Sequence, residues 1–255
     1  MSNVTCIIQA RMGSTRLPGK VLKKVLGKTM LEHQIERVKR AKTIDRIILA
    51  TTDRLEDKKI VRLAGKLKID VFAGSEADVL DRYYQTAMKF GVRDTILRLT
   101  GDCPLTDPGI IDDVVRLYLK NKKTCQYASN VGLPTFPDGM DAEVFSYSAL
   151  EESWKNAHLL SEREHVTLYI RNHPEKFKTR NLASKKVFPY FRLTLDNKED
   201  LILIRKIFIS LYPKNKYFSL SDTVKFLEKN SKLASINSHI RRNEGLLKSL
   251  KNDKK

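Results

Sequence analysis

The stretch IIQARMGSTRLPGK at residues 7–20 runs from an apolar strand into a loop that carries three cations and two glycines. Gly13 and Gly19 let the backbone of such a loop come close to a phosphate, because glycine has no Cβ. The guanidinium groups of Arg11 and Arg16 and the ammonium of Lys20 are suited to negatively charged oxygens. Five residues separate the two glycines and a valine follows the lysine, so the loop is not a P-loop. Its composition favours a triphosphate over a monophosphate as the ligand.

Segments of strand length alternate with segments of helical spacing through the first half of the chain. The expected strands cover residues 4–9, 46–52, 70–72 and 95–100. Expected helices lie between them, and the first opens with a capping box formed by Thr29 and Glu32. This alternation predicts an α/β fold with a largely parallel sheet covered by helices on both faces. Because ligands of such sheets bind beyond the carboxyl ends of the strands, the opening loop, residues 51–53 and residues 101–102 are expected on one edge.

The second half of the chain has a different pattern. Expected strands at residues 127–130 and 142–145 flank a loop at residues 132–141 that is rich in turn-forming residues. A further strand is expected at residues 190–195, followed by a helix at residues 198–211, and the sequence from residue 222 onward is helical and highly charged.

Two aspartates follow expected strands and are candidates for holding a hard cation. Asp102 follows the strand at residues 95–100, and Asp196 ends the strand at residues 190–195. Magnesium is usually bound by one or two carboxylates together with substrate phosphates, so this pair predicts a Mg²⁺ site. Asp196 also has an alternative interpretation, because with Glu199 it fits an N-terminal cap of the next helix.

The formal net charge of +18 raises the possibility of nucleic-acid binding. The lysines are spread along the whole chain, however, which is typical of a solvated surface rather than of a dedicated nucleic-acid patch. No apolar run approaches the length of a membrane span, and the three cysteines lack the spacing of metal ligands and are expected to be reduced thiols. We therefore expect a cytoplasmic protein with no membrane insertion and without nucleic acid as its partner.

Residues 10–20, ARMGSTRLPGK, resemble the signature loop of the cytidylyltransferases that activate sugar acids, the 3-deoxy-manno-octulosonate and acylneuraminate cytidylyltransferase group. Within that group the chain is most similar to the SpsF-type branch of spore-coat polysaccharide biosynthesis. The segments that carry this second resemblance are GSEADVLDRYY at residues 74–84, FPDGMDAEVF at residues 136–145, REHVT at residues 163–167 and LTLDNKEDL at residues 193–201.

The resemblance implies a nucleotide-diphospho-sugar transferase fold, a GT-A-like mixed sheet between helices in a three-layer sandwich, in a protein that is usually a homodimer. Residues 1–215 would form the catalytic domain, and residues 216–255 a basic helical extension that matches no known pattern. The implied reaction transfers CMP from CTP to an acidic or related sugar and releases pyrophosphate, for surface polysaccharide or glycan synthesis.

The resemblance also implies roles for individual residues. Arg11, Ser14, Arg16 and Lys20 would contact the CTP phosphates, and Asp102 and Asp196 would hold magnesium. Arg11, Lys20 and Asp102 are the expected catalytic residues. From their positions, further nucleotide contacts are expected at Ala10, Gly13, Thr52 and Asp78, and acceptor contacts at Asp138, Asp141, Arg163, Arg192 and His165.

Two alternatives to this function stay open: another enzyme of the same fold and, because of the net charge of +18, a nucleic-acid-binding protein. The same fold serves glycosyltransferases and other nucleotidyltransferases that use a different NTP. An Asp-x-Asp motif after a strand, typical of such glycosyltransferases, is missing. The octulosonate enzymes carry an acidic residue where this chain has Cys103, which leaves the identity of the acceptor sugar open.

Overall fold

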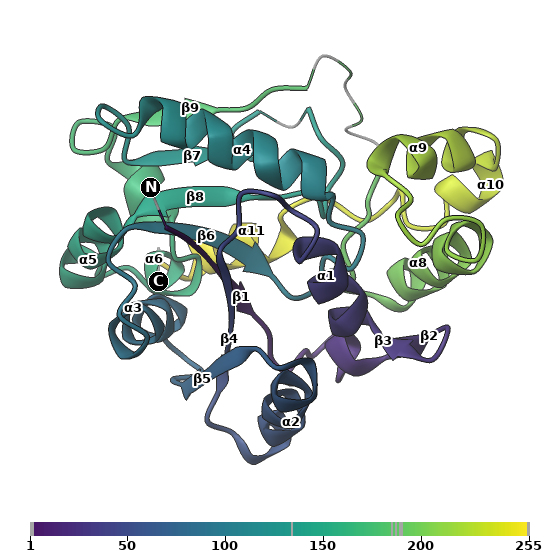
Figure 1. Cartoon of the computed structure of the whole chain (residues 1–255), viewed down its shortest axis with the longest axis horizontal. Coiled ribbons are helices and arrows are strands. Elements are labelled where there is room, and N and C mark those ends of the chain that lie inside the picture. The colour runs from purple at the N-terminus through teal and green to yellow at the C-terminus, as the bar shows by residue number, and fades with distance from the viewer. Residues whose placement is uncertain (1–2, 134, 185, 187, 189–190, 254–255) are drawn as a thin grey trace.

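The computed structural model describes residues 3–133, 135–184, 186, 188 and 191–253. In this part of the chain, seven strands form one sheet in the order β5, β4, β1, β6, β8, β7, β9 (Figure 1). The strands are β1 (Val4–Gln9), β4 (Arg46–Thr52), β5 (Asp70–Gly74), β6 (Thr95–Thr100), β7 (Tyr127–Ser129), β8 (Glu143–Ser146) and β9 (Thr179–Asn181). A separate hairpin pairs β2 (Lys24–Val25) with β3 (Lys28–Thr29).

The sheet is mixed, as the family resemblance implies. Strands β5, β4, β1 and β6 are parallel neighbours, whereas β8 runs antiparallel to both β6 and β7. Gln9 at the end of β1 lies opposite Thr100 at the end of β6 and Ala50 of β4. The loops that follow β1, β4 and β6 therefore start at one edge of the sheet, as the sequence predicts.

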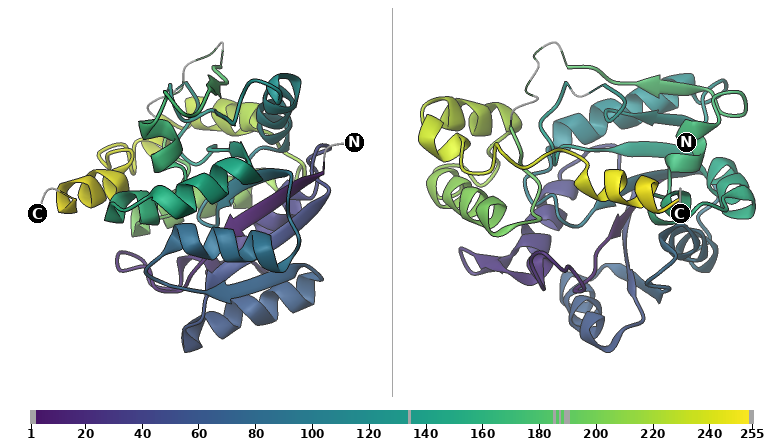
Figure 2. Two further views of the ribbon diagram at one scale, coloured as in Figure 1. Left: turned by 90° about the vertical axis from the view of Figure 1, so that its left-hand side faces the viewer. Right: turned by 180° about the vertical axis from the view of Figure 1, so that it is seen from behind.

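Helices cover both faces of the sheet and make three layers (Figures 1 and 2). Side chains of β1 alternate between two hydrophobic clusters: Cys6 and Ile8 point to one, and Ile7 points to the other. The first cluster is covered by α1 (Met30–Val38), α2 (Lys58–Leu67), α4 (Pro108–Asn121), α8 (Lys198–Leu211) and α9 (Leu220–Glu228). The second is covered by α3 (Val79–Lys89), α5 (Tyr147–Asn156) and α7 (Leu168–Asn172). No helix in the described ranges is long and apolar enough to cross a membrane.

Two helix starts decide where site residues lie. The predicted capping box of Thr29 and Glu32 is confirmed at the start of α1. The alternative interpretation of Asp196 and Glu199 as a cap is wrong, because Asn197 caps α8 and pairs with Asp200. Since Asp200 takes the capping role, receiving the backbone amides of Asp196 and Asn197 at 2.9 Å each, the Asp196 side chain is left for other contacts.

Residues 191–195 do not form the strand that was expected at residues 190–195. Tyr190 lies outside the described residues. Residue Arg192 makes only an isolated bridge to Asp138. The segment is instead fixed between two loops, because Leu193 donates its amide to the Asp138 carbonyl (2.7 Å) and Leu195 donates to the Asp102 carbonyl (2.8 Å). These contacts bring Asp196 beside Asp102, although no strand ladder places it there.

Gly139 allows this close approach of two loops. Its φ is +96°, and a Cβ on it would lie 2.6 Å from the backbone carbon of Leu193. Substitution of Gly139 would therefore push the two loops apart and strain the backbone.

We predict that Gly139→Ala lowers the free energy of unfolding by about 1 to 3 kcal/mol. Chemical denaturation followed by circular dichroism measures this change. Gly65→Ala in α2, where a Cβ meets no atom within 4 Å, is the matched control and should be neutral or stabilising. Equal effects of the two substitutions would contradict the role of Gly139.

Candidate active site

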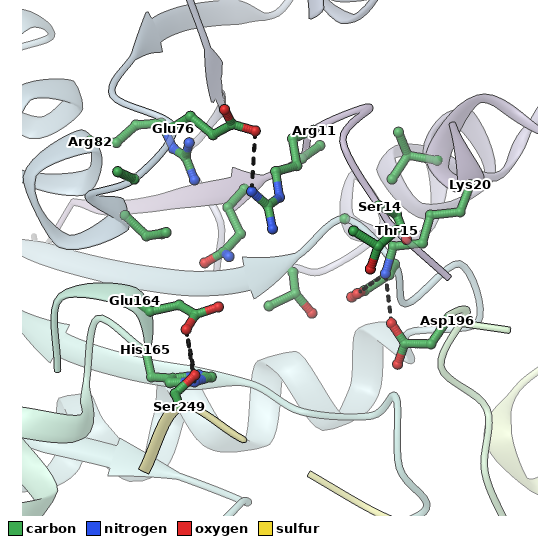
Figure 3. Close-up of a pocket in the computed structure, with 18 of the residues that line it drawn as sticks. Arg11, Ser14, Thr15, Lys20, Glu76, Arg82, Glu164, His165, Asp196 and Ser249 are labelled. Atoms are coloured by element: carbon green, nitrogen blue, oxygen red, sulfur yellow. Dashed lines mark hydrogen bonds and ion pairs between the residues drawn. The ribbon is translucent and has the colours of Figure 1, made fainter. Parts of the chain in front are cut away.

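A cavity of about 770 Å³ opens at the carboxyl ends of β1 and β6. The opening loop contributes to its lining with Arg11, Ser14, Thr15, Arg16 and Lys20. The other polar residues of the lining come from β1, β6 and the segments that follow the strands, from α3, and from the second half of the chain. They are Gln9, Thr100, Asp102, Asp196, Glu76, Arg82, Arg98, Glu164, His165, Ser249 and Asn252. Figure 3 shows many of these side chains around one space.

The ammonium of Lys20 lies between two carboxylates that are distant in sequence. Its Nζ is 2.6 Å from Oδ2 of Asp102 and 2.8 Å from Oδ1 of Asp196 (Figure 3). The side chains of Lys20, Asp102 and Asp196 are 12%, 24% and 18% exposed, so this charged cluster lies mostly out of water. The prediction that Asp102 and Asp196 converge is confirmed, and Lys20 faces the same cleft.

The contact between Lys20 and Asp102 affects the pKa of both groups. Burial alone would raise the pKa of Asp102, but the Lys20 ammonium lowers it to about 2. Burial alone would lower the pKa of Lys20, but Asp102 and Asp196 raise it. At neutral pH the cluster therefore holds an ammonium and an ionised Asp102.

Arg192 fixes Asp196 from the side away from Lys20. Its guanidinium contacts Asp196 at 2.7 Å, Asp138 at 2.7 Å and Asp200 at 3.1 Å, and only 7% of its side chain is exposed. Arg192 and Asp138, both predicted to contact the acceptor, are thus engaged with each other, and neither lines the cavity. Burial raises the pKa of Asp138.

The opening loop is held by a carboxylate that sequence reasoning missed. Asp57 accepts the Met12 amide at 2.7 Å, the Thr52 amide at 3.2 Å and the Thr52 hydroxyl. Thr52 is therefore buried beneath the loop and does not line the cavity, where it was predicted to contact the nucleotide. Asp57 ends a short 3-10 helix, Leu55–Asp57, directly before α2, and no sequence signal distinguishes it from the other acidic residues nearby.

The cations of the loop have different partners. Arg11 is 3.5 Å from Glu76, and Arg16 contacts both Asp196 (3.0 Å) and Glu244 (2.7 Å) near the C-terminus. Both guanidinium groups are partly exposed, so they can exchange these partners for phosphate oxygens at modest cost.

The remaining predicted residues divide between the cavity and its surroundings. His165 and Ala10 line the cavity, whereas Gly13 is in the loop but outside the lining. Asp78 caps α3 and pairs with Arg163, and this pair also lies outside the lining. Asp141 pairs with Arg242 at 2.8 Å outside the lining, where burial raises its pKa to about 7 although Arg242 opposes the shift.

Sequence reasoning also missed several polar groups at the base of the cavity. Oε1 of Gln9 and the Nε atoms of Arg82 and Arg98 are buried and have no hydrogen-bond partner within the described residues. All three residues line the cavity. Buried polar atoms without partners are costly, so these groups are suited to a polar ligand. A partial signal existed for Gln9, which ends a predicted strand next to the loop.

The donor set of Asp102 and Asp196 fits a magnesium ion. Both carboxylates lie within hydrogen-bond distance of a single cation, the Lys20 ammonium, and hard oxygen donors are the ligands that Mg²⁺ takes. Among the described residues, no group of three or more His, Cys, Asp or Glu side chains could hold a metal. Further ligands of such an ion would have to come from substrate phosphates and water.

Comparison with known families agrees with this geometry. The family model described as cytidylyltransferase matches residues 5–241. The chain belongs to the cytidylyltransferase family. The match includes the opening loop, Asp102, Asp196 and most of the segment that follows residue 215.

Individual relatives and one solved structure support the assignment. The spore coat polysaccharide biosynthesis protein SpsF of Bacillus subtilis is 36% identical over 220 residues, which are 82% of this chain and 87% of SpsF. The 3-deoxy-manno-octulosonate cytidylyltransferase of Geobacter sulfurreducens is 32% identical over 119 residues, 47% of this chain and 46% of that enzyme. A cytidylyltransferase structure from Leptospira borgpetersenii superposes with a TM-score of 0.88 at 36% identity, covering 95% of this chain and 100% of that one.

The protonation of Asp102 gives a pH-dependent prediction. Because its pKa in the folded protein is lower than its ordinary value of 3.8, the interaction with Lys20 stabilises the fold above about pH 4 and is lost as the pH falls through about 2. We expect Asp102→Asn to be less stable than the wild type by about 1.5 to 3 kcal/mol at pH 7, and by less at pH 3.

Urea denaturation at the two pH values measures the difference. Asp113→Asn is the control, because Asp113 also pairs with a cation, Arg116, but its side chain is 60% exposed. If the loss caused by Asp102→Asn were the same at pH 7 and pH 3, the charge on Asp102 would not be the cause.

Proposed function

We propose that the protein transfers CMP from CTP to a hydroxyl of an acidic sugar and releases pyrophosphate. The observation that carries this proposal is the convergence of Lys20, Asp102 and Asp196 at the end of a cation-rich loop. Family membership supports CTP as the nucleotide. The relatives named for spore coat polysaccharide and for 3-deoxy-manno-octulosonate support a sugar acid as the acceptor.

The loop would bind the triphosphate of CTP. Arg11, Arg16 and Lys20 carry the positive charge needed for the phosphate oxygens, and the Ser14 side chain lines the same space. In this proposal Lys20 leaves the carboxylates for the phosphates, because the triphosphate offers it a larger negative charge. Asp102 and Asp196 are then free to hold magnesium, which would neutralise phosphate charge and lower the pKa of the acceptor hydroxyl.

The chemical step is a displacement at the α-phosphorus. The acceptor oxygen forms a bond to this phosphorus, the bond to the β-phosphate oxygen breaks, and the hydroxyl proton passes to solvent. The residues of the site contribute by aligning the two substrates and by stabilising the charge on the departing pyrophosphate. Lys20 and Arg16 would stabilise this charge. Because magnesium held by Asp102 and Asp196 would lower the pKa of the acceptor hydroxyl, no side chain has to act as a general base.

The proposal extends to the setting of the enzyme. We place it in the cytoplasm, where CTP is made, as a homodimer of the kind that the family resemblance implies. A CMP-sugar produced there would serve surface polysaccharide or glycan synthesis, in agreement with the name of the Bacillus relative.

A pyrophosphate-release assay with CTP and a panel of sugar acids tests the proposal. We expect Lys20→Ala and Asp102→Asn each to lower kcat/KM by about 10²- to 10³-fold, because each removes a charge at the reacting phosphates. Lys24→Ala is the matched control, since Lys24 is an exposed lysine just beyond the loop and lies outside the cavity lining.

The same assay separates the alternatives. Turnover with another NTP but not with CTP would contradict the choice of nucleotide. Cleavage of a sugar nucleotide without pyrophosphate release would indicate a glycosyltransferase instead.

A further inference from the structure

The last part of the chain runs from α9 back across the molecule toward the helices of the second cluster (Figure 2), and it contributes to the lining of the cavity. Helices α10 (Ser231–Ala234) and α11 (Glu244–Asn252) follow α9, and α11 packs against α6 (Leu160–Glu164). Polar contacts on both sides fix this part: Glu244 with Arg16 of the opening loop at 2.7 Å, and Asp253 with the Ser161 amide at 3.0 Å. The C-terminal segment thus joins the phosphate-binding loop to the opposite wall.

Helix α11 contributes two polar side chains to the cavity, Ser249 and Asn252. The Ser249 hydroxyl donates a hydrogen bond to Glu164 and lies 3.0 Å from Nε2 of His165 (Figure 3). Burial lowers the pKa of His165. These four side chains form one wall of hydroxyl, amide, imidazole and carboxylate groups.

The packing of α11 is unusual for a helix held by a hydrophobic core. Within this helix the buried side chain is Ser249, while Leu247 and Leu250 are 49% and 36% exposed. An amphipathic helix normally buries its apolar side chains and exposes its serines. The Ser249 side chain is thus turned inward toward the cavity while the lysines of α11 stay exposed, and this placement of a hydroxyl favours a role in ligand binding.

The nucleotide and the acceptor can be assigned to different walls of the cavity. The opening loop, Glu76 and Arg82 lie at or after the ends of the parallel strands, where α/β sheets bind nucleotides. This assignment rests on the proposed function, and it leaves the wall formed by α6 and α11 for the acceptor.

We propose that α11 forms the acceptor side of the cavity and that Ser249 and Asn252 determine which acceptor is used. Hydroxyl and amide groups donate and accept hydrogen bonds, so they recognise the hydroxyl and amide substituents of a polyhydroxylated sugar acid. Asn252 contacts the acceptor directly. Ser249 contacts it and also holds His165 and Glu164 in place.

The test uses the full-length protein with 3-deoxy-manno-octulosonate and N-acetylneuraminate as acceptors. For Ser249→Ala and Asn252→Ala we measure kcat/KM for each acid by pyrophosphate release and Kd for CTP by calorimetry. We expect the ratio of kcat/KM between the two acids to change by about 10-fold or more, because each variant loses a polar contact to substituents in which the two acids differ. The Kd for CTP should stay within about twofold of the wild type.

Lys251→Ala is the matched control, since it is exposed on the same helix and lies outside the lining. Asn252 is exposed too, so Asn252→Ala keeps the test valid if Ser249→Ala fails to fold. Wild-type ratios in both variants, or a weakened Kd for CTP with unchanged ratios, would overturn the inference. A wild-type protein that binds CTP but releases no pyrophosphate with sugar acids would instead overturn the proposed function, on which the inference rests.

Discussion

The Lys20 ammonium holds together two carboxylates that the fold brings from opposite halves of the chain. Asp102 follows a parallel strand, whereas Asp196 belongs to an irregular segment fixed between two loops. Without a cation between them, two carboxylates at this spacing would repel each other in a site that is mostly shielded from water. Arg192 and Arg16 add two further cations around Asp196, at 2.7 Å and 3.0 Å.

The contact of Lys20 with Asp102 and Asp196 also bears on the proposed reaction. Lys20 lies between Asp102 and Asp196, where the divalent ion of the proposed mechanism would lie, and its ammonium keeps the two side chains close together. A triphosphate offers Lys20 and Arg16 stronger partners than a single carboxylate does. In the proposed mechanism the nucleotide would free the two carboxylates for magnesium by withdrawing the ammonium from them, and the binding of nucleotide and ion would depend on each other.

Much of the fold and of the candidate site could be predicted from local sequence. Apolar strands followed by Arg11, Lys20 and Asp102 identify one edge of a parallel sheet, because strand direction places those loops together. Residues that depend on long-range packing could not be predicted. Asp57 supports the loop from the end of a short 3-10 helix, and α11 reaches the cavity through polar contacts that leave no periodic signal. Asp196 was predicted to lie beside Asp102, but loop contacts place it there instead of the expected strand.

A manganese titration in the absence of nucleotide tests the central claim most directly, with bound ion followed by electron paramagnetic resonance. If Lys20 and a divalent ion compete for Asp102 and Asp196, Lys20→Ala should bind one ion per chain about 10-fold or more tightly than the wild type. Adding Asp196→Asn to Lys20→Ala should remove that gain. Equal affinity in the wild type and Lys20→Ala would contradict the account.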